Sequence, residues 1–117
     1  MEALTKEEFL KKWNALNIMN GNVVQVFYEP NYVASLVISI MKDPVDPSSG
    51  QCYWAATMFD YKPSALIETF GYANTIEDLG ELVYEGMKRR TLNEDPSNIS
   101  LMYESVSEWA DRVYGNW

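Results

Sequence analysis

The chain has 117 residues, of which 47% are hydrophobic and 14% aromatic, and it carries a formal net charge of −8. This size and apolar content predict one globular domain over residues 1–117 and exclude a disordered chain. The acidic excess disfavours direct binding to nucleic acid or to an anionic membrane surface. We expect a soluble cytoplasmic protein, because no secretory signal pattern is visible and the single cysteine, Cys52, cannot form an intrachain disulfide.

The N-terminal segment predicts a helix that begins at Thr5. Thr5 and Glu8 match a capping box, in which each side chain satisfies a backbone N–H group of the first turn. The dipeptide Asn20-Gly21 is typical of a turn and should follow the end of this helix. The apolar stripe of the helix, which should face the core, consists of Phe9, Trp13 and Leu16.

Three runs rich in β-branched and aromatic residues then predict strands: Val23–Tyr28, Tyr32–Met41 and about Gln51–Tyr61. A Pro-rich loop over residues 42–50 separates the last two. The third strand is apolar on both faces and should be central, with Cys52 as a small buried residue. In the second strand, the alternate positions that should meet the helices are Tyr32, Ala34, Leu36, Ile38 and Ile40.

The C-terminal half predicts two further helices and leaves one segment open. Residues 65–72 fit a fourth strand, with a short helix as the alternative. A second helix should begin at Thr75 and end at the basic run 88–90, whose charge suits a helix C-terminus. A last helix is expected over about Asn98–Tyr114. The sequence therefore predicts an α+β fold in the order α-β-β-β-(β)-α-α, a three- to four-stranded antiparallel sheet with one N-terminal and two C-terminal helices.

The residue types that most often carry catalysis or bind metals are sparse. The chain has no histidine, the commonest general base and metal ligand. The acidic stretches Asp43–Asp46 and Asn93–Asp95 do not match a calcium loop and are explained as turns. We therefore expect no metal, no cofactor and no catalytic activity. A small enzyme that uses two carboxylates distant in sequence is an alternative.

Acidic side chains are concentrated in the C-terminal half, where residues 63–117 hold ten acidic and four basic residues. In the two predicted helices they recur about once per turn, roughly 6 Å apart, away from the apolar stripe. One interpretation is a solvated surface; the other is a row of carboxylates that imitates DNA phosphates, which repeat about every 3.4 Å per strand. The candidate partner-binding residues are Glu77, Asp78, Glu81, Glu85, Glu94, Asp95, Glu104, Glu108 and Asp111.

In size, acidity, outward charge over about residues 68–111 and mixed α/β layout, the chain resembles the small prokaryotic and phage DNA-mimic proteins. Within that group it is most similar to the Neisserial mimic that engages the histone-like HU protein. The resemblance implies a non-catalytic inhibitor that occupies the DNA-binding surface of an HU-like nucleoid protein, a repressor or a nuclease. Two features depart from the group: the charge of −8 is modest, and the basic run 88–90 interrupts the acidic field. The alternative is a phage accessory or immunity-type interaction module that binds through exposed aromatics, including Trp117.

Overall fold

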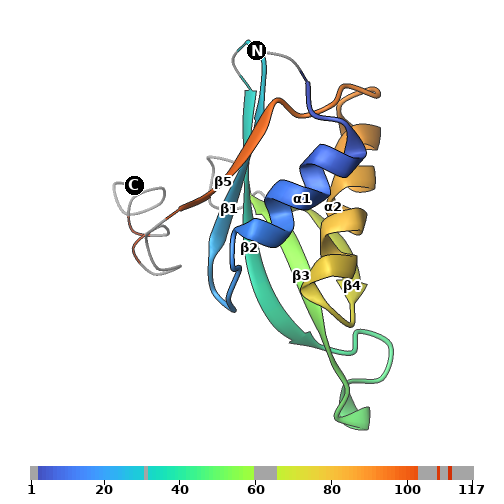
Figure 1. Cartoon of the computed structure of the whole chain (residues 1–117). Helices are drawn as coiled ribbons and strands as arrows, with labels where there is room; N and C mark the ends of the chain where they lie inside the picture. The colour runs from blue at the N-terminus through green and yellow to red at the C-terminus, as the bar shows by residue number, and fades with distance from the viewer. Residues whose placement is uncertain (1–2, 31, 60–65, 103–107, 109–110, 112–117) are drawn as a thin grey trace.

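The computed structural model describes residues 3–30, 32–59, 66–102, 108 and 111, and its two long helices lie on one face of a sheet (Figure 1). Its elements are α1 (Lys6–Ala15), β1 (Val23–Tyr28), β2 (Tyr32–Lys42), the short 3-10 helix η1 (Pro47–Ser49), β3 (Cys52–Phe59), β4 (Leu66–Ala73), α2 (Ile76–Arg90) and β5 (Asn98–Met102). The five strands pair antiparallel in the order β4-β3-β2-β1-β5. The α+β class is confirmed, with a larger sheet than predicted.

Helix α1 forms as its sequence predicts. The Thr5 hydroxyl accepts a hydrogen bond from the Glu8 N–H at 3.1 Å, and the Glu8 carboxylate accepts one from the Thr5 N–H at 3.0 Å. Phe9 and Trp13 are fully buried beneath the helix. The Trp13 indole N–H also donates to the Ile76 carbonyl at 2.8 Å. This bond ties α1 to the first turn of α2, although the two residues are far apart in sequence.

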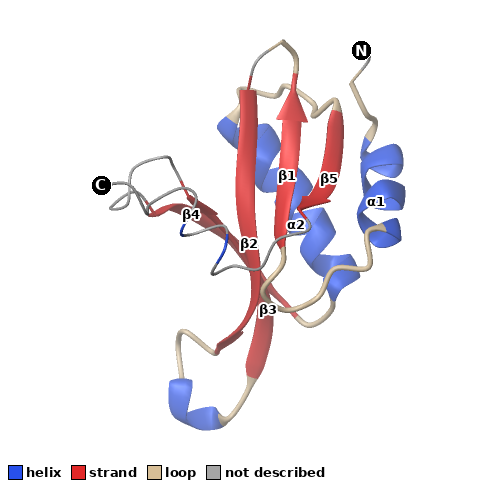
Figure 2. Ribbon diagram, turned by 90° about the vertical axis from the view of Figure 1, so that its left-hand side faces the viewer, coloured by secondary structure: helices blue, strands red, loops and turns tan. Residues whose placement is uncertain are grey.

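Helix α2 lies on the same face of the sheet as α1 and packs against α1, β4 and β3 (Figures 1 and 2). Two glycines allow its close approach to its neighbours. A Cβ at Gly80 would lie 2.6 Å from the Trp13 ring, and one at Gly86 would overlap the Phe70 ring of β4. Both contacts are shorter than van der Waals contact permits, so the position of α2 depends on these glycines.

The face of β2 predicted to meet the helices is correct only in its middle. Ala34, Leu36 and Ile38 are buried, but Tyr32 is 43% exposed and Ile40 is 47% exposed. The strand alternates as expected, yet it is longer than the helix layer that covers it. β1 pairs with β2 only over residues 32–37, so Ile40 lies beyond the end of β1. The β2–β3 hairpin projects past the helices with η1 at its tip (Figure 2).

The prediction of a last helix starting at Asn98 is wrong for its first five residues. Asn98–Met102 is an edge strand that pairs with β1, with Ile99 opposite Val26 and Leu101 opposite Val24. Ile99 is 4% exposed, so burial on the sheet outweighs the helical spacing read from the sequence. Residues 103–107, 109–110 and 112–117 of the predicted helix lie outside the described residues.

The pairing of the strands accounts for two further outcomes, those of segment 65–72 and of Cys52. The open segment 65–72 is a strand over Leu66–Ala73, paired with β3, while Ala65 lies outside the described residues. Cys52 is exposed, so its prediction as a buried residue is wrong. The reason is its place at the first position of β3, opposite Lys42, in the part of the hairpin that neither β1 nor β4 flanks.

Candidate acidic interaction surface

The acidic residues predicted on α2 lie on its solvent side. Thr75 caps the helix, because its hydroxyl accepts a hydrogen bond from the Asp78 N–H at 3.0 Å. Glu77 and Asp78 occupy the first turn, where negative charge is favoured by the helix dipole. The buried side of the helix contains Leu79, Val83 and Met87, whereas the exposed acidic residues are Glu77, Asp78, Glu81 and Glu85.

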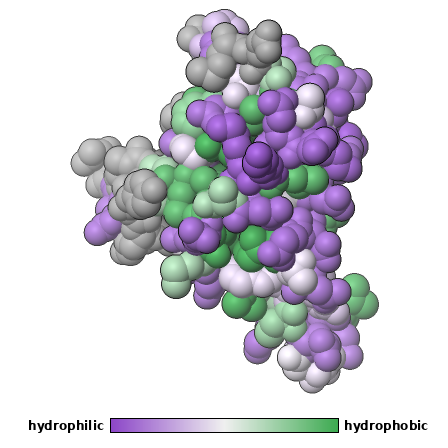
Figure 3. Space-filling view, viewed as in Figure 1, coloured by the Kyte–Doolittle hydropathy of each residue, from purple (hydrophilic) through white to green (hydrophobic). Residues whose placement is uncertain are grey.

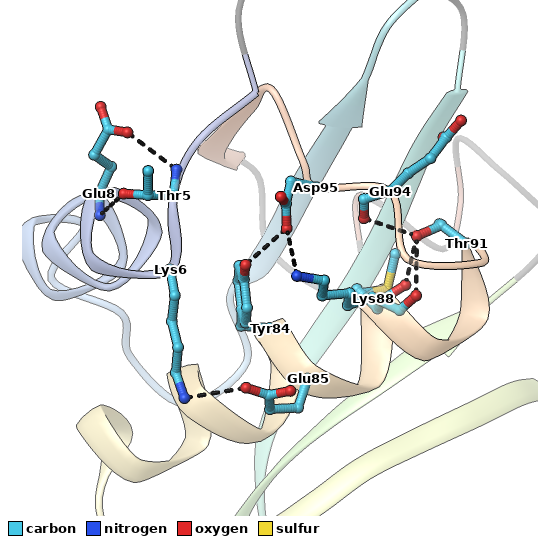
Figure 4. A network of polar contacts seen from close by, with 10 residues as sticks. Thr5, Lys6, Glu8, Tyr84, Glu85, Lys88, Thr91, Glu94 and Asp95 are labelled. Atoms are coloured by element: carbon cyan, nitrogen blue, oxygen red, sulfur yellow. Dashed lines mark hydrogen bonds and ion pairs between the residues drawn. The ribbon is translucent and has the colours of Figure 1, made fainter.

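Glu85 is compensated by a lysine of the neighbouring helix. The Lys6 ammonium lies 3.0 Å from the Glu85 carboxylate, and both side chains are about half exposed (Figure 4). The hydrogen bond and charge of Glu85 raise the pKa of Lys6, with a smaller contribution from the charge of Glu81. The row of carboxylates on α2 is therefore neutralised at its last member, and the first three members are not ion-paired to any described residue.

Asp95 belongs to a polar network that connects the C-terminal end of α2 to the loop that follows it (Figure 4). Its carboxylate accepts a hydrogen bond from the Tyr84 hydroxyl at 2.7 Å and lies 3.4 Å from the Lys88 ammonium. Burial and this hydrogen bond raise the pKa of Tyr84, and Asp95 raises the pKa of Lys88. Asp95 therefore fixes the α2–β5 loop and is only partly available to a partner.

The helix layer as a whole is electrically balanced. Its surface is largely hydrophilic (Figure 3). It carries six acidic residues (Glu7, Glu8, Glu77, Asp78, Glu81, Glu85) and six basic ones (Lys6, Lys11, Lys12, Lys88, Arg89, Arg90). The excess of −8 therefore comes from the rest of the chain, and the acidic residues of α2 form a local patch at its N-terminal half.

The remaining predicted residues do not join that patch along α2. Glu94 is exposed in the loop after α2, and the basic run 88–90 separates it from the N-terminal half of the helix. Over this 15-residue helix the separation is roughly 20 Å. Glu108 and Asp111 are helical and exposed, while Glu104 lies outside the described residues. The structure thus brings together four of the predicted residues and places Glu94 and Asp95 at the opposite end of the helix.

Two shallow pockets at this opposite end were missed by the sequence analysis. A pocket of about 470 Å³ is lined by Tyr32, Arg90, Thr91, Leu92 and Glu94. A smaller one of about 220 Å³ is lined by Ala3, Tyr28, Glu29, Glu94, Asp95 and Ser97. Both form where the β1–β2 turn meets the α2–β5 loop. The only sequence signal was the acidic stretch 93–95, which was interpreted as a turn.

Among the described residues, no group of three or more acidic or cysteine side chains is arranged to hold a metal ion. No helix within the described ranges has the length and apolar character needed to cross a membrane. Neither the protein-family models, nor the curated proteins, nor the solved structures contain a match to this chain.

Proposed function

We propose that the protein is a non-catalytic inhibitor that binds a basic DNA-binding protein, such as an HU-like nucleoid protein, and mimics DNA. One observation carries the proposal. Glu77, Asp78 and Glu81 are exposed within two turns of one helix, and no salt bridge between described residues involves them. Three uncompensated carboxylates on one helix attract lysine and arginine side chains that otherwise contact phosphates.

Support for the proposal also comes from how firmly this end of α2 is held. The Thr75 cap defines the start of the helix, and the Trp13 indole holds the Ile76 carbonyl. A fixed backbone loses little conformational entropy when a partner binds. Glu77 and Glu81 are separated by about one helical turn, about 6 Å along the helix axis, which is close to the axial rise over two nucleotides of one DNA strand, about 7 Å.

The other predicted contact residues contribute to different degrees in this proposal. Glu85 and Asp95 add less attraction, because Lys6 and Lys88 already lie within 3.4 Å of their carboxylates. Glu94 is exposed and extends the negative potential beyond α2, and Glu108 and Asp111 are exposed outside this helix. The binding surface is therefore centred on the N-terminal half of the helix.

A competition experiment tests this function. Labelled duplex DNA is bound to an HU-like nucleoid protein, and the present protein is added at increasing concentration. We expect displacement of the DNA, weakened roughly five- to tenfold in the double variant Glu77→Gln/Glu81→Gln, because each exposed charge contributes up to about 1 kcal/mol. The matched control is Asp43→Asn/Asp46→Asn, which removes the same charge from the tip of the β2–β3 hairpin. Failure of the wild-type protein to displace DNA contradicts the proposal, and so does equal weakening by both variants.

A second candidate function is supported by exposed apolar side chains on the projecting hairpin. Ile40, Met41 and Val45 are 47%, 38% and 92% exposed, with Ile40 and Met41 on opposite faces of β2, and Met19 is 69% exposed. Exposed apolar side chains of this kind suit an interaction module that binds by apolar contact. Partner binding that is indifferent to salt and is lost in Ile40→Ser favours this function over the first. Trp117, which the sequence analysis included in such a surface, lies outside the described residues.

A further inference from the structure

Leu92, two residues after the end of α2, is a leucine at a position where the fold uses a left-handed backbone and needs no apolar side chain. It lies in the left-handed region with φ 57°, and it is 89% exposed. The left-handed turn lets the Asn93 N–H donate to the Lys88 carbonyl at 2.8 Å, which ends the helix. Glycine fits this position without strain, whereas a leucine is strained and also leaves a large apolar side chain in water. Residues held in sparsely populated backbone conformations cluster at active sites and ligand clamps.

The pocket beside Leu92 has walls that are fixed by contacts of their own. Tyr32, which lines it, packs against the Tyr28 ring with 5.6 Å between ring centroids. The Thr91 hydroxyl lies 2.9 Å from the Met87 carbonyl and 3.0 Å from the Glu94 carbonyl, which holds the loop against the helix. These contacts hold the walls of the pocket in place, and Tyr32 and Leu92 supply its apolar surface.

The adjoining smaller pocket has three acidic residues in its lining, Glu29, Glu94 and Asp95, and Glu94 lines both pockets. Glu29 and Glu94 are exposed in it and take part in no salt bridge between described residues. Tyr28, also in its wall, is 4% exposed, and its hydroxyl has no hydrogen-bond partner within the described part of the chain. Burial raises the pKa of the Tyr28 hydroxyl, and the charges of Asp95 and Glu94 raise it further.

Two of the three basic residues at the end of α2 are paired with other carboxylates. Arg90 lies in the wall of the larger pocket but is 3.5 Å from the Glu68 carboxylate of β4. Lys88 is paired with Asp95. Glu29 and Glu94 form no salt bridge with a described residue, and they lie beside the exposed apolar side chains of Leu92 and Tyr32.

We propose that this end of the molecule binds a basic segment of a protein partner, with an apolar side chain against Leu92 and Tyr32 and the adjacent lysine or arginine against Glu29 and Glu94. The basic character of the partner rests on the proposed function, while the site itself rests on the two pockets. The site lies at the end of α2 opposite to Glu77 and Glu81, so one partner reaches both ends only if its contact surface spans the helix.

Two short peptides of equal charge test the site without the full partner. The probes are acetyl-Gly-Lys-Leu-Lys-Gly-amide and acetyl-Gly-Lys-Ser-Lys-Gly-amide, titrated into isotopically labelled protein and followed by amide NMR shifts. We expect the leucine peptide to shift the amides of residues 91–95 and of Tyr32, with affinity roughly tenfold above that of the serine peptide, since burial of one leucine contributes about this factor.

Two variants separate a docking role from a structural one. Leu92→Gly should lose most of the preference for the leucine peptide while its thermal unfolding midpoint rises, because the left-handed strain is removed. Val45→Gly, at an equally exposed apolar residue of the hairpin loop, should leave peptide binding unchanged.

The proposal is overturned if neither peptide shifts these amides, if the two peptides bind equally, or if Leu92→Gly binds as the wild type does. These outcomes are independent of the DNA competition experiment. Peptide binding without DNA displacement would support this site and refute the proposed function. DNA displacement without peptide binding would support the proposed function and refute this site.

Discussion

The two ends of α2 differ in how their charges are compensated. At the N-terminal end, Glu77, Asp78 and Glu81 are exposed and form no salt bridge with described residues. At the C-terminal end, Lys88 is paired with Asp95 and Arg90 with Glu68. This helix, whose total charge is nearly balanced, thus has unpaired carboxylates in its first turns, whereas two of the three basic residues in its last turn are paired. The charge that α2 offers to solvent therefore depends on which side chains are paired with neighbouring elements, more than on the number of charged residues.

The largest expected effect comes from removing the support of the N-terminal end. Trp13 is fully buried and donates to the Ile76 carbonyl. Trp13→Ala should lower the free energy of unfolding by about 3–5 kcal/mol, through lost burial and an unsatisfied carbonyl. Urea unfolding measures this loss. Leu10→Ala, at a partly buried position of the same helix, is the control and should cost less than half as much. A loss below about 1 kcal/mol for Trp13→Ala would show that α1 does not hold this end of α2.

The polar network at the C-terminal end should contribute less. Tyr84→Phe removes the 2.7 Å hydrogen bond to Asp95 and should lower the free energy of unfolding by about 1–2 kcal/mol, since the acceptor is charged and partly buried. The matched control is Tyr53→Phe, whose hydroxyl lies 3.5 Å from Asp43, and its effect should be under about 0.5 kcal/mol. Equal losses of unfolding free energy in the two variants would mean that the Tyr84–Asp95 hydrogen bond does not stabilise the α2–β5 loop.

A pH-dependent effect is expected from Tyr28. Burial raises the pKa of Tyr28 to about 12, so the folded protein keeps the phenol proton at a pH where the unfolded chain releases it. The free energy of unfolding should therefore be unaffected by this group below pH 10 and should fall between pH 10 and 12, by roughly 1–2 kcal/mol. Unfolding of Tyr28→Phe at pH 8 and pH 11 should show a smaller decrease than the wild type. The same decrease in both proteins would rule out Tyr28 as its source.

The smallest expected effect has the opposite sign. Leu92→Gly should raise the free energy of unfolding by about 0.5–1 kcal/mol, because glycine adopts the left-handed conformation at Leu92 without a Cβ clash. Val45→Gly is the control. The backbone φ of Val45 is not positive, so this substitution should not stabilise the protein. A destabilised Leu92→Gly variant would show that the leucine side chain supports the fold, contrary to its exposure.

Elements with strong local signals were predictable from the sequence. The Thr5–Glu8 capping box, the buried positions Phe9 and Trp13, and the start of α2 after Thr75 all depend on residues within a few positions of one another. Strand β5 was not predictable in this way. Its five residues are a strand because β1 supplies hydrogen-bond partners, and Ile99 and Leu101 alone are too short a pattern to indicate alternation.

The sequence predicts on which side of α2 the acidic residues lie, but not which of them form salt bridges. The spacing of Glu77, Glu81 and Glu85 placed all three on the solvent side of α2. Pairing of Glu85 with Lys6 could not be foreseen, since it depends on how α1 packs beside α2. The pockets at Leu92 were missed for the same reason, because two turns distant in sequence form them together.

The most direct test of the central claim is the salt dependence of binding to an HU-like nucleoid protein. The dissociation constant is measured at about 50 mM and about 200 mM salt for the wild type and for Glu77→Gln/Glu81→Gln. Screening should weaken the wild-type complex as salt rises, and the variant should start weaker and lose less. The same dissociation constant for both proteins at low salt, or wild-type binding that does not change with salt, would contradict the assignment of the free carboxylates of α2 as the binding surface.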